Sequence, residues 1–278
     1  MRLRVQGPRL RGARSFSPAA RKAKPATSGT EILALWGPSD VEVFFGKMVI
    51  SAHQPYFAPF AGLFYKAHLS DVFVLLDEVQ FPRGTTWMSR NRFKNDKGAL
   101  WITIPAWKKG LGLQSIGDVR ICHEGRWREK HLESLATAYS HAPYMDDHGP
   151  FLEEIFSGTI ETLVELNVRI IRHLMTSLSV EARLVLQSEL GVSAGGTKLL
   201  IDLSKRAGCS TFLAQSASEK YLKAEEFHAN GIELKTFRYP EIIYPQLWGD
   251  FVPNLSAFDL LLNCGPKARD ILCGCGKG

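Results

Sequence analysis

Apolar residues recur with two different periods along this chain, and the changes between them predict its strands and helices. Residues 48–53 and 71–77 are short apolar runs with β-branched residues, and the second is continuous enough for a strand buried on both faces. Residues 59–70, between them, have helical spacing. Strand, helix and strand in this order predict a βαβ unit with two parallel strands.

The same alternation returns in the second half of the chain. Strands and helices are expected there in turn, over residues 183–187, 197–208, 210–215, 218–231 and 232–237. The middle is less regular and predicts strands over 100–105 and 118–122 and amphipathic helices over 125–143 and 159–178. We therefore expect an α/β, Rossmann-like fold with a mostly parallel sheet, helices on both faces and a helical insertion in the middle.

Polar residues cluster directly after four of the expected strands. They are His53 and Gln54, then Asp77, Glu78 and Gln80, then Ser188, Glu189, Gly195 and Gly196, and finally Gln215 and Ser216. The carboxyl ends of parallel strands meet at one edge of a sheet, and ligands bind at that edge. The four clusters therefore predict a single ligand-binding crevice.

Individual residues of these clusters suggest catalytic roles. His53 is the candidate general base, and Asp77 could orient it or bind a sugar hydroxyl. Gln54 and Gln80 offer amide donors, and all four are candidate site residues. Each also has a structural interpretation, since a histidine or a carboxylate can simply cap a turn or a helix.

The glycine pair Gly195–Gly196 precedes an expected helix and follows Glu189, a further candidate ligand-binding residue. Free backbone N–H groups at a helix N-terminus can hold an anion, so the pair is a candidate anion cradle. The alternative is a plain connection, and the GxxxxGK[ST] pattern of a Walker A loop is absent from the sequence.

The segment WMSRNRFK, residues 87–94, alternates basic and other residues. In an extended conformation Arg90, Arg92 and Lys94 share one face, while Asn91 lies on the other. Three cations on one face suit a phosphate or a carboxylate, which arginine binds in bidentate fashion. We take all four as candidate ligand-binding residues, with a solvated edge strand as the alternative.

The net charge of +6 is confined to the N-terminal tail. Residues 1–47 hold nine basic and three acidic residues, so residues 48–278 are neutral, and nucleic acid is not a favoured partner. The tail is rich in Arg, Pro, Gly and Ala and cannot build a core. It is interpreted as a disordered extension upstream of a true start at Met48, with a transit peptide as the alternative.

The remaining composition predicts a single domain over residues 48–272 and a frayed tail over 273–278. The chain has five cysteines, an odd number, which favours reduced thiols and a cytoplasmic protein. The three C-terminal cysteines lack the spacing of a structural zinc site, so no metal is expected. No stretch reaches the roughly 18 uninterrupted apolar residues of a membrane span.

Two long stretches carry a family resemblance: AHQPYFAPFAGLFYKAHLSDVFVLLDEVQFPRGTTWMSRNRFK and YPQLWGDFVPNLSAFDLLLNCGP. Both resemble the WbqC-like proteins, and the resemblance extends over residues 48–272. The second stretch adds Tyr244, Gln246 and Asn254 as candidate ligand-binding residues.

Members of that family are bacterial, and the resemblance implies a role in O-antigen or other surface polysaccharide synthesis. The implied reaction is the transfer of an aminoacyl or acyl group, of the glycine type, to a sugar or nucleotide sugar. The partner is then a small-molecule or nucleotide-sugar ligand, while the cofactor and the oligomeric state stay unassigned. Two alternatives remain open: a non-catalytic module that binds a nucleotide sugar or a partner, and an adenylate-forming, nucleotidyltransferase-like enzyme.

Overall fold

The structure is a computed structural model that describes residues 47–158 and 160–274, all of them in the unit formed by residues 44–278. The expectations for residues 1–46, and for residues 275–278 of the expected frayed tail, lie outside the described residues.

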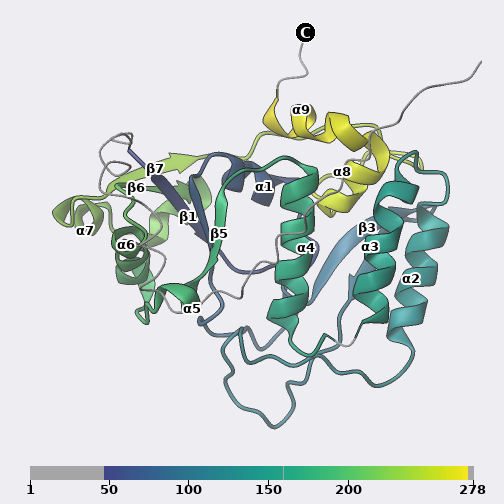
Figure 1. Cartoon of the computed structure of the whole chain (residues 1–278), viewed down its shortest axis with the longest axis horizontal. Helices are drawn as coiled ribbons and strands as arrows, with labels where there is room; N and C mark the ends of the chain where they lie inside the picture. The colour runs from purple at the N-terminus through teal and green to yellow at the C-terminus, as the bar shows by residue number, and fades with distance from the viewer. Residues whose placement is uncertain (1–46, 159, 275–278) are drawn as a thin grey trace, which may run out of the picture. The chain divides into compact units, whose positions relative to one another are not determined.

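The described residues form a five-stranded sheet in which every pair of neighbouring strands is parallel (Figure 1). Its strand order is β5-β2-β1-β6-β7. The strands are β1 (Val49–His53), β2 (Val72–Leu75), β5 (Arg183–Leu186), β6 (Thr211–Gln215) and β7 (Glu233–Phe237). The expected α/β fold with a parallel sheet is confirmed. Its β1, α1 and β2 form the predicted βαβ unit.

Helices cover both faces of this sheet, because its strands are apolar on both sides. The helices are α1 (Ala61–His68), α2 (Trp127–Ala138), α3 (Met145–Ser157), α4 (Leu163–Ser177), α5 (Gln187–Leu190), α6 (Gly196–Arg206), α7 (Ala224–Ala229), α8 (Ala257–Cys264) and α9 (Ala268–Cys273). Phe73 and Leu75 of β2 belong to the hydrophobic core that includes α1, α4 and α8. Val72 and Val74, on the opposite face, belong to a second core with α6 and α7.

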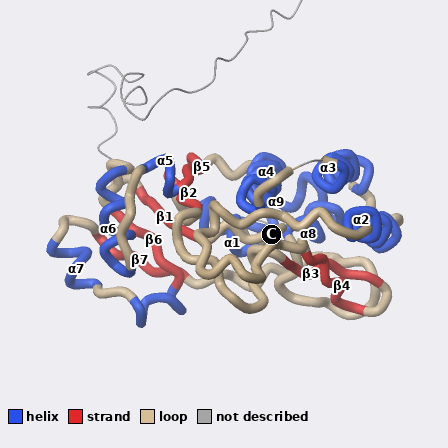
Figure 2. The backbone as a smooth tube through the Cα atoms, turned by 90° about the horizontal axis from the view of Figure 1, so that it is seen from below, coloured by secondary structure: helices blue, strands red, loops and turns tan. Residues whose placement is uncertain are grey.

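Between β2 and β5 the chain forms an antiparallel hairpin and three helices. The hairpin, β3 (Arg90–Asn95) and β4 (Gly98–Thr103), is a separate two-stranded sheet that lies beside α8 (Figure 2). The strand expected over 118–122 is wrong, since Arg120 and Ile121 form only isolated bridges. Their partners, Thr162 and Ala106, lie in connecting segments and not in a continuous neighbouring strand.

Four helices were not expected from the sequence: α3, α5, α8 and α9. The helix expected over 218–231 is divided into a 3-10 turn over Ser216–Tyr221 and the short helix α7. Helix α4 begins four residues after the expected start at 159, because the hydroxyl of Thr162 accepts a hydrogen bond from the backbone N–H of Glu165 at 3.3 Å and so caps the helix.

A buried polar network joins the hairpin to α8. The carboxylate of Asp259 accepts hydrogen bonds from the hydroxyls of Tyr139 at 2.7 Å and Tyr244 at 2.8 Å. The Tyr139 hydroxyl in turn accepts a bond from the backbone N–H of Lys94 at 3.0 Å. Asp259 is fully buried, so each of these groups depends on the others for a partner.

We predict that Asp259→Ala lowers the free energy of unfolding by about 3 kcal/mol, because it leaves two buried tyrosine hydroxyls without an acceptor. Urea denaturation of the variant checks this. The control is Glu124→Ala, at an exposed position, which should stay within about 0.5 kcal/mol of the wild type. Equal stability of the two variants would contradict the proposed cost.

Candidate functional site: a cavity at the carboxyl edge of the sheet

The strand order places a cavity at the point where the sheet reverses its winding. From β1 the chain moves to β2 on one side, whereas β6 flanks β1 on the other side. His53 ends β1 and Gln215 ends β6, and both line a cavity of about 620 Å³. Such a switch point is where ligands bind in doubly wound folds.

The cavity is walled by the corner after β1, the hairpin, and the segment after β7. Its lining residues are His53, Tyr56, Phe60, Ala61, Gly62, Trp87, Asn91, Arg92, Gln215, Tyr239, Pro240, Glu241, Ile242, Tyr244, Phe251, Pro253, Asn254 and Leu255. It therefore combines aromatic walls with an imidazole, a guanidinium, a carboxylate and amides, a mixture typical of small-molecule sites.

The corner after β1 is fixed by two buried asparagines. The amide of Asn167 donates to the carbonyls of Pro55 at 2.7 Å and Met88 at 2.8 Å. The amide of Asn91 donates to the carbonyls of Phe57 at 3.0 Å and Ala58 at 2.8 Å. These bonds hold residues 55–58 in one conformation, although Ala58 has a left-handed φ of 40°.

His53 is held in one tautomer at the floor of this corner. Its Nδ1 donates to the backbone carbonyl of Gln54 at 2.8 Å, which leaves Nε2 with a free lone pair. Its ring also meets Tyr56 edge-on, with ring centroids 4.5 Å apart. An imidazole held in this way can accept a proton or a hydrogen bond from a ligand in the cavity.

The surroundings keep His53 neutral. Its pKa is lowered to about 3, chiefly by desolvation and then by the positive charge of Lys66, while the bond to Gln54 opposes both. Lys66 is buried beneath the corner and donates to the carbonyl of Ala52 at 2.6 Å. Burial also lowers the pKa of Lys66 to about 8.

Tyr239 contributes a hydroxyl that has no hydrogen-bond partner among the described residues, although the atom is buried. Desolvation, followed by the nearby Tyr56, raises the pKa of Tyr239, so the phenol stays protonated and remains a donor. Its ring packs edge-on against Phe60, with centroids 5.4 Å apart. A buried donor without an acceptor calls for a ligand or a water molecule.

Arg92 is the cation of the cavity. One Nη donates to the carbonyls of Pro253 at 3.1 Å and Asn254 at 3.2 Å, whereas its buried Nε has no partner. None of the ion pairs formed by the described residues involves Arg92. Its remaining N–H groups are therefore available to an anionic ligand.

A stack of aromatic rings lies beside Arg92. The guanidinium of Arg90 lies 3.7 Å from the ring centroid of Trp101, and Trp101 stacks on Trp87 with centroids 5.7 Å apart. Trp87 lines the cavity, whereas Trp101 and Arg90 do not. Trp87 thus offers a ring surface to a ligand, and Arg90 supports the stack from behind.

The three cations expected on one face of the hairpin have separate roles. Lys94 is buried and donates to Gln246 Oε1 at 3.1 Å and to the carbonyl of Asp250 at 2.6 Å. Neither Lys94 nor Gln246 lines the cavity. Of the residues expected at the site, the cavity brings together His53, Asn91, Arg92, Tyr244 and Asn254.

The carboxyl ends of β2 and β5 form a separate, internally bonded edge. Asp77 accepts bonds from the backbone N–H of Ser188 at 3.0 Å and from its hydroxyl at 2.6 Å. Glu189 accepts a bond from the backbone N–H of Leu186 at 2.9 Å. The other expected residues that do not line the cavity are Gln54, Gln80, Gly195 and Gly196.

Four cavity residues were missed as site residues: Tyr56, Trp87, Tyr239 and Glu241. Tyr239 and Glu241 closely follow β7, a strand that the sequence does predict. Polar residues after parallel strands lie at the ligand-binding edge of the sheet, so both residues could have been predicted in the same way. Trp87 begins the basic segment that the sequence analysis singled out. Tyr56 closely follows the predicted cluster of His53 and Gln54.

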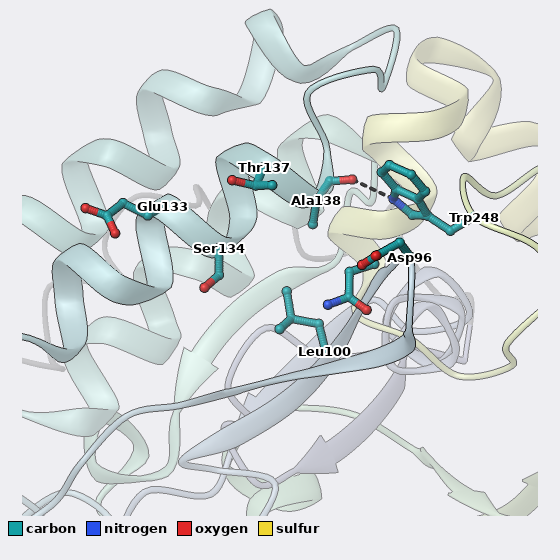
Figure 3. A pocket seen from close by; sticks show the side chains of 8 residues that line it. Asp96, Leu100, Glu133, Ser134, Thr137, Ala138 and Trp248 are labelled. Carbon is teal, nitrogen blue, oxygen red and sulfur yellow. Dashed lines mark hydrogen bonds between the residues drawn. The ribbon is translucent and has the colours of Figure 1, made fainter.

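A second cavity, of about 450 Å³, lies between α2 and the turn of the hairpin (Figure 3). Its carboxylates come from Asp96 and Glu133, and Trp248 closes one side through a 2.7 Å bond from its indole N–H to the carbonyl of Ala138. It contains no histidine, lysine or arginine and shares no lining residue with the first cavity. The candidate site is therefore the first cavity.

The described residues contain neither a membrane-spanning helix nor a cluster of metal-ligating side chains. No helix within residues 47–158 and 160–274 is long and apolar enough to cross a membrane. In the same part of the chain, no three His, Cys, Asp or Glu residues are grouped to hold a metal ion.

The parallel sheet with a cavity at its switch point defines an α/β protein of the doubly wound class. The model of the WbqC-like protein family matches residues 54–271, and the chain belongs to this family. It is 30% identical over 225 residues to a protein of Mycobacterium tuberculosis (strain ATCC 25618 / H37Rv) named "Uncharacterized protein Rv1507c", covering 80% of this chain and 96% of that protein. No solved structure gave a significant match.

We predict that His53 stays neutral, with its proton on Nδ1, from pH 8 down to about pH 4. Imidazole ¹⁵N shifts recorded over this range check both points, and the His53→Gln variant identifies the signals. Protonation of this ring near pH 6.5 would contradict the desolvated environment described above.

The same shift predicts how acid affects stability. Unfolded His53 titrates near pH 6.5 and folded His53 near pH 3, so the unfolded state binds more protons between these values. The stability contributed by the neutral ring is present above pH 6.5 and is lost as the pH falls toward 3, by at most about 1.4 kcal/mol per pH unit. Urea denaturation at several pH values should therefore show a shallower acid dependence for His53→Gln than for the wild type.

Proposed function

We propose that this chain is a transferase that moves an aminoacyl or acyl group to a sugar or nucleotide sugar bound in the cavity at the switch point. The observation that carries the proposal is the neutral His53, whose Nδ1 is tied to Gln54 and whose Nε2 remains free. The free nitrogen of His53 lies in the same cavity as Arg92, whose guanidinium forms no ion pair with the described residues. This combination suits proton removal from a substrate that also carries an anionic group.

The proposed reaction uses two groups of the chain, His53 and Tyr239. The attacking hydroxyl or amine of the sugar forms the new bond to the acyl carbon and gives its proton to His53 Nε2. The phenol of Tyr239 donates a hydrogen bond to the oxyanion that develops on the acyl oxygen. His53 then returns the proton to the leaving group of an activated acyl donor as the old bond breaks.

The low pKa of His53 makes it a weak base while the cavity is empty. A ligand phosphate beside Arg92 places a negative charge in the same cavity, and this charge favours the protonated imidazole. The base therefore becomes stronger once the anionic substrate is in place. Lys66 acts in the opposite direction, which keeps the ring unprotonated in the absence of substrate.

The ligand class follows from the neighbouring Arg92 and Trp87. The guanidinium of Arg92 lies 6.0 Å from the ring centroid of Trp87, so an anionic group and a ring can be bound side by side. Nucleotide sugars carry both a diphosphate and rings that stack on tryptophan. The carboxylate of Glu241, at the same cavity, is suited to accept hydrogen bonds from sugar hydroxyls.

The non-catalytic module is the second candidate, because the same cavity could bind the ligand for a partner enzyme. The transferase proposal includes surface polysaccharide synthesis in the cytoplasm as its setting. It gives Asp77 no role in the reaction, since the carboxylate of Asp77 already accepts two hydrogen bonds from Ser188. The structure offers the adenylate-forming reaction no specific support: Ala61, Gly62 and Leu63 stand where a second histidine would be needed.

We predict that a nucleotide sugar raises the melting temperature of the protein and that Arg92→Gln removes the shift. Saturation at about 100 times Kd stabilises the folded state by about 2.7 kcal/mol, or roughly 5–10 °C for a chain of this size. Thermal-shift measurements check this with UDP-, GDP- and dTDP-sugars. The matched control is Arg172→Gln, at an exposed position on α4, which should keep the full shift.

His53→Gln separates catalysis from binding. The transferase proposal predicts a loss of turnover of about 10²-fold or more with the thermal shift by the nucleotide sugar largely kept. Mass spectrometry of the sugar product, with an activated acyl donor supplied, measures the turnover. Ligand binding without any acyl transfer by the wild-type chain would favour the non-catalytic module.

A further inference from the structure

Charge is unevenly distributed along the neutral body of the chain. Residues 79–117 hold seven basic residues and one acidic residue, a net charge of +6, whereas residues 48–278 as a whole are neutral. The basic residues are Arg83, Arg90, Arg92, Lys94, Lys97, Lys108 and Lys109. This concentration was hidden in the sequence analysis, because the body was counted as one unit.

The same stretch exposes most of the large apolar side chains at the surface. Of the eight exposed large hydrophobic residues in the described chain, five lie within residues 79–117: Trp87, Trp101, Trp107, Leu111 and Leu113. Leu111 is 55% and Leu113 is 60% exposed, and Trp107 is 45% exposed. Three of these exposed side chains, Trp107, Leu111 and Leu113, lie within seven residues of one loop, and such a concentration marks an interaction surface.

We call residues 105–115 the amphipathic loop. It is fastened to residues 81–84 by the bond from Phe81 N–H to the Gln114 carbonyl at 2.9 Å and the bond from Lys108 Nζ to the Gly84 carbonyl at 3.3 Å. Gly110 and Gly112 turn the loop with φ values of 80° and 67°. In Figure 1 the connections that precede α2 form loops at the bottom of the view, beyond the ends of the helices.

We propose that the amphipathic loop docks on an anionic lipid surface. Trp107, Leu111 and Leu113 would enter the interface, while the exposed Arg83 and Lys109 meet the lipid phosphates. Side chains of this composition combine burial of apolar area with electrostatic attraction, as peripheral membrane surfaces do. The proposal does not depend on the reaction performed in the cavity.

Charge and side-chain type favour this occupant over others. A second copy of the chain would bring the exposed Arg83 and Lys109 of both copies together, and residues 1–30 are also basic, with eight Lys or Arg and no acid. Nucleic acid complements the charge, but aliphatic Leu111 and Leu113 do not stack on bases as aromatic residues do. A lipid surface satisfies both the leucines and the lysines.

The test is flotation of the full chain with vesicles of phosphatidylcholine alone and with vesicles that also contain about 30% phosphatidylglycerol, an anionic lipid that attracts basic segments. We expect binding to the anionic vesicles only. The double variant Leu111→Ser/Leu113→Ser should bind about tenfold more weakly, and Lys108→Gln/Lys109→Gln should also bind more weakly. Tyr221→Ser, which removes an exposed ring elsewhere, is the matched control and should bind as the wild type does.

A second measurement separates the loop from the basic N-terminal residues, which attract anionic vesicles in every variant. Lipids brominated in their acyl chains quench tryptophans that enter the interface, and Trp107→Phe should remove part of this quenching. Unchanged quenching in Trp107→Phe, or equal binding of the leucine variant and the wild type, would overturn the proposal. Binding of single-stranded RNA in competition with vesicles, lost in the same variants, would reassign the loop to nucleic acid.

Discussion

The candidate site depends on two buried asparagine side chains. Asn91 and Asn167 together satisfy the carbonyls of three residues in the corner after β1, those of Pro55, Phe57 and Ala58. Without these amides the carbonyls would be buried and unpaired, at a cost of about 1–3 kcal/mol each. Because the corner carries Tyr56 and follows His53 directly, its fixed conformation sets the imidazole, the phenol and the position of α1 together.

The polar residues of the body divide into those that hold the fold and those left without partners. Asp77 and Lys94 are charged residues whose bonds are made within the protein: one joins β2 to the segment after β5, and the other joins the hairpin to residues 246–250. Arg92 Nε and the Tyr239 hydroxyl remain buried without partners. Arg92 and Tyr239 both line the cavity, so these two groups have bonding capacity for a ligand there.

Periodicity predicted the sheet well, because a parallel strand buried on both faces leaves a continuous apolar run, as in Val72–Leu75. His53 and Gln215 themselves, which end β1 and β6, line the cavity, whereas Gln54 and Ser216 do not. The sequence could not show that Asp77 would be occupied by Ser188, since that contact spans 111 positions. Nor could alternation show that Lys94 would be buried, because the covering residues 246–250 come from the far end of the chain. The segment 118–122 alternates like a strand but finds no continuous partner.

The size of the cavity depends on a side chain that is absent. Gly62 lies in the first turn of α1, and a Cβ placed there would meet the rings of Phe60 and Tyr239, the latter at 2.9 Å. Any larger residue would push these aromatic walls apart or inward, so position 62 limits how bulky a bound molecule can be.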